Sequence, residues 1–260
     1  PNTPDPESLA VLRNLQVRLQ AFSDNGLTSE KQRTADLLSW WFTGQAALYD
    51  YYYLQEPLGP TLGIQAQLPI LLSEYVFHNK QDVQNYLELL KQLPAYFSEI
   101  AAFEQRKADA GLLMNAESLQ KLINQCREFS SETENTFWAS SFRERISNCQ
   151  FLSNDEQIAC EIRHQKLLHQ AVFPAYTQLA ADLDTMLPLA PSEPLGLAHV
   201  PNGTSYFQWL LTYQIGTDRT ISEIRDLLEE QIATDYETIL EAVQNGVDLL
   251  HPVSEHPLFD

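Results

Sequence analysis

No glycine occurs between Gly111 and Gly196, and this interval restricts the fold more than any other feature of the sequence. A sandwich or barrel of short strands needs a turn about every 8–12 residues, and glycine supplies many of those turns. The interval therefore favours long helices over a sheet.

Apolar residues recur at helical spacing in two long stretches of the chain. Two helix starts also carry a reciprocal capping pattern, Ser153-x-x-Glu156 and Thr220-x-x-Glu223, in which the hydroxyl accepts from a free backbone amide and the glutamate reaches back. The two stripes consist of Val83, Leu87, Leu90, Pro94, Phe97 and Ala101, and of Ile221, Ile224, Leu228, Ile232, Tyr236, Leu240 and Val243.

These patterns predict an all-α fold, a multi-helix array of about nine helices with no substantial sheet. Pro94 and Pro174 each remove a backbone hydrogen bond inside a predicted helix, so we expect a kink or break at both. The predicted helices cover residues 7–22, 29–54, 65–78, 80–108, 115–131, 137–148, 154–187, 203–214 and 221–246.

The segments richest in helix-breaking residues are 56–63 and 188–203. We expect residues 1–28 to form an N-terminal helix and its lead-in, and residues 29–187 to form the main helical body. Residues 188–203 then form a Pro-rich connection, which is either a linker or an ordered loop, and residues 204–260 form the C-terminal helices.

The charge balance excludes several classes of partner. Lys and Arg number 16 against 35 Asp and Glu, giving a net charge of −19, which repels phosphate backbones and anionic lipid surfaces. The apolar runs, such as residues 68–72, are far shorter than the roughly 18–20 residues of a membrane span. We predict no nucleic-acid partner and no membrane span in this segment.

The familiar catalytic and metal-binding motifs do not occur in the sequence. There is no His-Glu-x-x-His, no Gly-x-Ser-x-Gly and no phosphate-binding or dinucleotide-binding glycine loop. His164 and His169 are five residues apart, which turns their rings about 140° away from each other on a helix. We therefore predict no catalytic residue, no metal ligand and no cofactor in this chain.

The chain has three cysteines, Cys126, Cys149 and Cys160. The odd count excludes a fully paired framework, and no Cys-x-x-Cys pair occurs. A hairpin turn near Ser153 would bring Cys149 and Cys160 within bridging distance, whereas buried free thiols are the commoner state. Both alternatives remain open from the sequence.

Aromatic residues gather in two places. Between residues 40 and 53, three tyrosines follow Trp40-Trp41-Phe42 and Tyr49, for which core packing is the favoured interpretation over a binding site. The second group, Tyr206, Trp209 and Tyr213, follows a predicted Pro201-Asn202-Gly203 turn at i, i+3 and i+7.

Five segments, taken in order, carry a family resemblance. They are Gly63-Ile-Gln-Ala-Gln-Leu-Pro69, Asp82-x-x-x-Tyr86-Leu-x-Leu-Leu, the run from Tyr96 to Leu113, Gly196-Leu-Ala-His-Val-Pro-Asn-Gly203 with Tyr206-Phe207, and Thr217-Asp-Arg-Thr-Ile-Ser-Glu-Ile224. Over about residues 30 to 246 they resemble the bacterial domain of unknown function 885 family. Members of that family resemble helical zinc peptidases of the gluzincin type, with a His-Glu-x-x-Pro-Gly-His-like motif in the C-terminal half, and many resemble exported or lipid-anchored proteins.

No zinc motif of that kind occurs up to Asp260, so the resemblance implies that zinc is held by a C-terminal catalytic half. We therefore predict a non-catalytic N-terminal helical portion of an extracytoplasmic metallopeptidase-like protein, with its export signal removed, that is inactive alone. Its partners would be the catalytic half of the same protein and a peptide substrate. The alternative is a catalytically empty helical module that binds a protein or peptide. The residues expected to line the substrate cleft are His199, Asn202, Tyr206, Trp209 and Tyr213.

Overall fold

The computed structural model describes residues 5–23, 26–131, 137–193 and 196–246. These residues form helices and connections and include no strand, which confirms the all-α prediction. Contacts divide the chain into two compact units, residues 1–204 and 205–260, and each unit is described by itself.

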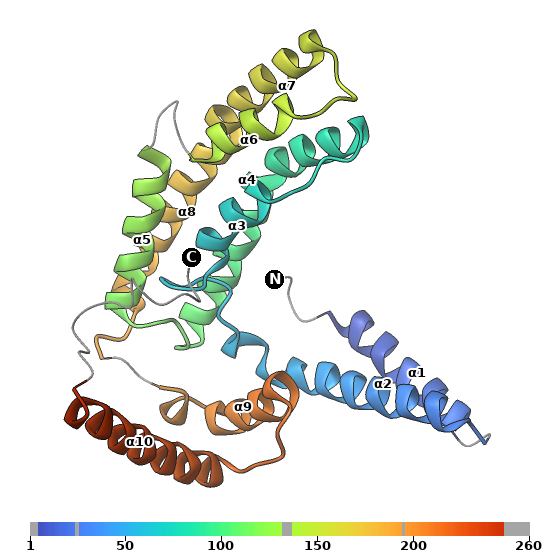
Figure 1. The fold of residues 1–260 in the computed structure, drawn as a ribbon, viewed down its shortest axis with the longest axis vertical. Coiled ribbons are helices and arrows are strands. Elements are labelled where there is room, and N and C mark those ends of the chain that lie inside the picture. Colours follow the sequence, from blue (N-terminus) through green and yellow to red (C-terminus); the bar gives the residue numbers. More distant parts are fainter. Residues whose placement is uncertain (1–4, 24–25, 132–136, 194–195, 247–260) are drawn as a thin grey trace. The chain divides into compact units, whose positions relative to one another are not determined.

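The first unit contains eight α-helices and the start of a ninth within its described residues (Figure 1). Short 3-10 helices follow at η1 (Tyr49–Leu54), η3 (Leu187–Leu189) and η4 (Leu197–His199), and a π-helical turn, η2 (Leu168–Val172), separates two of the α-helices. The α-helices are α1 (Pro6–Ser23), α2 (Ser29–Leu48), α3 (Ile64–Ser73), α4 (Lys80–Asp109), α5 (Ala116–Ser131), α6 (Phe137–Ser147), α7 (Asn154–Leu167), α8 (Phe173–Met186) and α9 (Gly203–Leu210).

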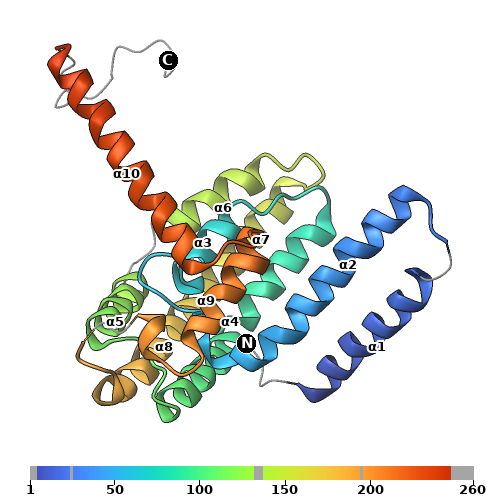
Figure 2. The same cartoon turned by 90° about the horizontal axis from the view of Figure 1, so that it is seen from below.

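The core of the first unit is built on α4, whose apolar stripe faces inward. Helix α8 packs against both α4 and α5, and α6 packs against α7 (Figures 1 and 2). At the centre, the ring of Phe97 meets Tyr176 edge-on at 4.8 Å between centroids, and Phe129 approaches Tyr176 at 4.2 Å. Leu87, Leu90 and Tyr176 are at most 1% exposed, so the predicted stripe of α4 is the core face except at Pro94, which is exposed.

Proline has opposite effects at the two predicted break points. Pro174 lies in the first turn of α8, directly after η2, where a missing backbone N–H leaves no hydrogen bond unmade. The helix predicted over 154–187 is therefore divided, as expected. Pro94 leaves α4 continuous, because the buried residues Leu90, Leu93 and Phe97 hold the turns on both sides of it in the core.

Three predicted helices end earlier than the sequence pattern suggested. The helix predicted over 29–54 ends at Leu48 and continues as η1, and the one predicted over 65–78 ends at Ser73. The helix predicted over 203–214 changes at Leu211 into a π-helical turn, η5 (Leu211–Ile215). In each case apolar periodicity continued past the point where the backbone hydrogen-bond pattern changed.

The interpretation of the first aromatic group as core is wrong for its tryptophans. Trp40 is 38% exposed and Trp41 is 45% exposed. Both lie on α2, whose contacts in the first unit are mainly with α1 and η1. Tyr52 and Tyr53 behave as expected, since both rings pack on Phe103 of α4.

The cysteines are buried and free. Cys149 and Cys160 are therefore not bridged in this structure, and burial raises the pKa of each thiol above its usual value. Burial raises the pKa of Cys126 furthest, to about 12, which leaves it unreactive at neutral pH.

The second unit contains the end of α9, η5 and α10 (Ile221–Gln244). Gly216 ends η5 with a left-handed backbone, φ 80°, which glycine adopts without steric cost. Helix α10 begins at the predicted capping box: Thr220 Oγ1 accepts from the Glu223 amide, and Glu223 accepts from the Thr220 amide. No residue of α10 is buried.

Candidate functional site

The predicted cleft residues divide between the two units. His199 and Asn202 lie in residues 1–204, whereas Tyr206, Trp209 and Tyr213 lie in residues 205–260. The structure brings together the last three: Tyr206 and Trp209 stack at 5.9 Å between centroids, and Trp209 and Tyr213 lie 5.7 Å apart. This is the ladder expected from spacing on one helix face.

Burial limits which of these rings a ligand could reach. Tyr206 is 8% exposed and Trp209 is 5% exposed, whereas Tyr213 is half-buried. That these three rings line a substrate cleft therefore stays a prediction. Tyr213 is the most accessible of the three.

The turn that precedes α9 has the predicted geometry. Asn202 adopts a left-handed backbone, φ 61°, which asparagine tolerates better than most residues. Gly203 begins α9, and a Cβ added there would lie 1.7 Å from the Leu197 carbonyl oxygen. Only glycine fits, so this contact fixes the path of the 196–203 segment, on which His199 and Asn202 are exposed.

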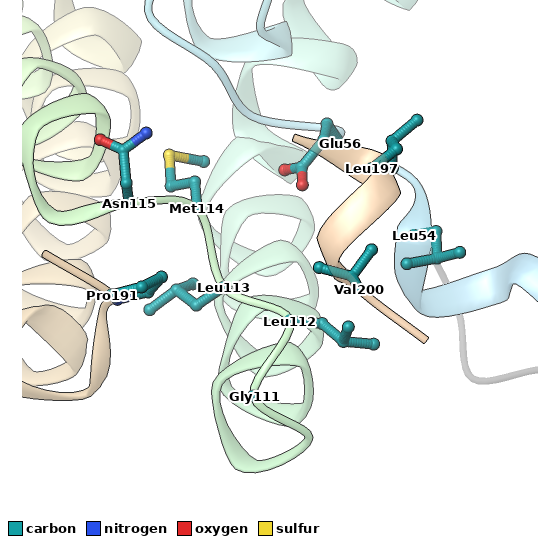
Figure 3. A pocket seen from close by; sticks show the side chains of 10 residues that line it. All are labelled: Leu54, Glu56, Gly111, Leu112, Leu113, Met114, Asn115, Pro191, Leu197 and Val200. Carbon is teal, nitrogen blue, oxygen red and sulfur yellow. The ribbon is translucent and has the colours of Figure 1, made fainter. Parts of the chain in front are cut away.

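A pocket of about 160 Å3 lies beside this segment, within the first unit (Figure 3). Leu197 and Val200 line it on one side together with Glu56, and Leu113 and Met114 line it on the other. Its walls come from the end of η1, the turn between α4 and α5, Pro191 and residues 197–200. Among the described residues of the lining, Glu56 is the charged one.

Behind Glu56 lies a buried ion-pair cluster. Lys107 Nζ donates to Glu56 Oε2 at 2.6 Å and to the Gln55 carbonyl at 3.1 Å, and lies 3.5 Å from Glu104 Oε2. The side chains of Lys107 and Glu104 are both fully buried, whereas half of the Glu56 side chain is exposed. One buried cation thus serves two carboxylates.

The charges of this cluster are incompletely satisfied. Neither carboxylate oxygen of Glu104 has a hydrogen bond, and the same is true of the buried Tyr52 hydroxyl and Arg106 Nε. Burial raises the pKa of Glu104 to about 7; Lys107 opposes the shift and Glu56 adds to it. Glu104 can therefore gain or lose a proton near neutral pH.

The arrangement allows binding more readily than bond-breaking chemistry. A carboxylate in an apolar pocket can hold a cationic or hydrogen-bond-donating group, and a buried acid with a shifted pKa is a feature of functional sites. Across the described ranges, no group of three or more His, Cys, Asp or Glu side chains is placed to hold a metal ion. His164 illustrates why: it is buried against Tyr86, with Nε2 3.1 Å from the tyrosine oxygen, whereas His169 is exposed.

Sequence reasoning did not single out Glu56, Glu104 and Lys107 as site residues. A signal was present, because Phe103-Glu104-x-x-Lys107 places opposite charges at i and i+3 in a stretch whose other members are largely apolar. A pair of opposite charges at i and i+3 on an exposed helix face has the same sequence pattern, so the pattern does not show that the pair is buried. The Glu104–Lys107 pair is buried because η1 lies over this part of α4. The continuous helix predicted over 29–54 did not include η1 as a separate element.

Comparison with known proteins gives a family and a fold. The sequence profile of the family "Bacterial protein of unknown function (DUF885)" matches residues 4–247. No curated protein matches the chain. The crystal structure of "the putative lipoprotein from Colwellia psychrerythraea" superposes with a TM-score of 0.70 at 17% identity; the match covers 94% of this chain and 44% of that one. The chain thus spans less than half the length of that protein.

Proposed function

The chain belongs to the DUF885 family of bacterial proteins, and we propose that it is the N-terminal, non-catalytic helical portion of a zinc metallopeptidase-like protein. Zinc and its ligands would belong to a C-terminal catalytic half. This portion would form one wall of the substrate cleft, lined by His199, Asn202, Tyr206, Trp209 and Tyr213.

The observation that carries the proposal is the coverage of the similar structure. The same helical fold accounts for nearly all of this chain and for only 44% of the other protein. That likeness concerns the fold alone, and it supports a role as part of a larger assembly of helices.

The second unit offers a surface for such an assembly. Leu228, Ile232 and Tyr236 on α10 are each more than half exposed, although they form a regular apolar stripe. Covering that stripe would remove apolar area from water, which is the main favourable contribution to most protein associations. We assign the stripe to contact with the catalytic half.

The proposal includes an extracytoplasmic location, exported or lipid-anchored. It is supported by the description of the similar structure as a "putative lipoprotein". Among the described helices, none is long and apolar enough to cross a membrane.

The test compares this chain with a longer protein that contains it followed by the catalytic half. We expect stoichiometric zinc and chelator-sensitive peptide hydrolysis only in the longer protein, measured by metal analysis and with a mixed peptide pool. Zinc-dependent turnover by the isolated chain would contradict the proposal. A longer protein with neither zinc nor turnover would favour the alternative of a catalytically empty interaction module.

The cleft assignment is tested separately. In the longer protein, Tyr213→Phe and His199→Ala should lower kcat/KM while the melting temperature stays within a few degrees of the parent. Tyr96→Phe, in a half-buried tyrosine outside the predicted cleft, serves as the matched control. Full activity in both cleft variants would show that this segment does not line the substrate cleft.

A further inference from the structure

A groove of about 530 Å3 lies at the opposite end of α4 from the Glu104 cluster. It is formed by the segment that joins α3 to α4 and by the end of α6 with the turn that follows it. Tyr75, Phe77 and Phe151 give it apolar walls, and its lining also includes the charged residues Glu74 and Arg145 and the imidazole of His78.

Arg145 is held firmly in the lining of this groove. Its Nη1 donates to the Tyr75 carbonyl at 2.6 Å, and its Nε donates to the Ser141 carbonyl at 3.2 Å. The guanidinium also lies over the rings of Phe77 and Tyr86, at 4.9 and 5.2 Å from their centroids. Its position is therefore fixed by the fold and needs no ligand to define it.

Within the described residues, no carboxylate forms an ion pair with Arg145, whereas Arg143 on the same helix pairs with Glu161. Arg145 Nη2 is buried and has no hydrogen-bond partner. Burial lowers the pKa of His164 to about 3, and the positive charge of Arg145 adds to the shift.

Arg145 differs from the exposed basic residues that have no ion pair, because it is partly buried beside an apolar groove in a protein with 35 acidic residues and a net charge of −19. A partly buried guanidinium that donates only to neutral carbonyls retains attraction for an anion, and solvent screens that attraction less than on an open surface. A buried charged donor without a partner also leaves hydrogen-bonding capacity unused.

We propose that this groove binds a singly charged carboxylate that carries an apolar group, such as an N-acylated amino acid or a peptide C-terminus. The single charge of Arg145 matches one carboxylate, and Glu74 in the same lining disfavours a dianion. Tyr75, Phe77 and Phe151 provide contact area for the apolar group. The site shares no residue with the predicted cleft and does not depend on the proposed function.

The test uses N-acetyl-phenylalanine as the probe and measures its dissociation constant by titration calorimetry or by NMR shifts. We expect the free acid to bind at least about tenfold more tightly than its neutral amide or inorganic phosphate. A tripeptide ending in a free phenylalanine, compared with the same peptide amidated, distinguishes the peptide C-terminus from the small acid as ligand.

Variants then locate the site. Arg145→Met should weaken binding of the free acid at least about tenfold, and Arg143→Met, which removes the same charge from the same helix outside the groove, should not. If Arg145→Met fails to fold, the dissociation constants of the free acid and its amide in the unaltered protein still test whether the carboxylate is recognised. Equal binding of acid and amide, tighter binding of phosphate, or no binding at millimolar concentrations would overturn the proposal.

Discussion

Helices α4 and α10 have the same design in sequence and opposite environments in the structure. Both begin with a capping box, and both carry an apolar stripe at helical spacing. On α4, Val83, Leu87 and Leu90 are fully buried, whereas on α10 Leu228 is 53% exposed and Ile232 is 67% exposed. Amphipathic spacing therefore predicts a helix and the face it would bury, but not whether that face is covered.

The difference identifies where the stability of each helix comes from. Helix α4 is held by apolar burial in the core, and its interior charges are tolerated because Lys107 and Glu104 lie together. Helix α10 has no buried residue, so we expect its stability to come mainly from its cap, its local hydrogen bonds and its intrinsic propensity, which support a helix marginally in water. Each of the following measurements tests that contrast.

The largest expected effect comes from the same substitution placed on each stripe. Leu90→Ala should lower the free energy of unfolding by about 2–5 kcal/mol, because it removes a fully buried side chain and leaves a cavity. Leu228→Ala, on the exposed stripe, should change it by less than about 0.5 kcal/mol. Urea denaturation followed by circular dichroism measures both.

If Leu228→Ala cost as much as Leu90→Ala in this chain, the contrast between the helices would be wrong. In a longer protein that includes the proposed catalytic half, Leu228→Ala should lower the free energy of unfolding by more than it does in this chain. That shift would show that the stripe is covered only in the larger protein.

Local sequence patterns predicted helix positions and buried faces correctly where residues within a few positions of each other determine them. The stripe of α4, the caps at Ser153 and Thr220 and the break near Pro174 follow from side-chain chemistry within a few residues. Burial of Trp40 and Trp41 depends on whether another element covers α2, which no local pattern encodes. Pro94 shows the same limit, because tertiary contacts on α4 overrode the local preference to break.

The second-largest expected effect is a pH dependence of stability that comes from Glu104, a carboxyl group buried in α4. The pKa of Glu104 is about 7 in the folded protein, above its usual 4.5, so the folded state binds the proton more tightly than the unfolded state. The stability associated with that proton is present below pH 4.5 and is lost as the pH rises through about 7. The loss is of the order of 3 kcal/mol, from about 1.4 kcal/mol per pKa unit.

Glu104→Gln removes this titration and keeps the shape of the side chain. Between pH 4.5 and pH 8, the free energy of unfolding of the variant should therefore rise by about 3 kcal/mol relative to that of the parent, as measured by chemical denaturation. Glu230→Gln, on exposed α10, is the matched control and should follow the parent at every pH. A constant difference between Glu104→Gln and the parent would show that Glu104 titrates normally.

The candidate site was less predictable than the fold. Helical spacing predicted the ladder of Tyr206, Trp209 and Tyr213, and the Pro-Asn-Gly residue types predicted the turn at Asn202. Glu56 and Glu104 are 48 residues apart in the sequence, and only the packing of η1 on α4 brings both to Lys107. A site made by distant segments needs the fold before its members can be recognised.

A smaller effect comes from the caps. Ser153→Ala and Thr220→Ala each remove a side chain that accepts from a free backbone amide, at a cost of about 1 kcal/mol. In α7 the cost should appear in global unfolding, because Cys160 and His164 tie that helix to the core. In α10 it should appear as lost helicity and faster amide exchange, without a change in global stability. Equal effects on global unfolding would contradict the contrast between covered and uncovered helices.

The smallest expected effect concerns charge on α10. Glu237 and Glu241 lie four residues apart near a helix C-terminus that has no basic residue in its last turn, so each repels the other and the negative end of the helix dipole. Glu241→Gln should therefore stabilise α10 by a few tenths of a kcal/mol, roughly 0.3–0.5, seen as slower amide exchange at low salt. Glu223→Gln, at the opposite end, should have the opposite sign, because Glu223 completes the capping box and favours the positive end of the dipole. Both effects should shrink in about 1 M salt, where the screening length falls to about 3 Å. A salt-independent gain from Glu241→Gln would show that the residue acts through packing, and that α10 is covered in this chain after all.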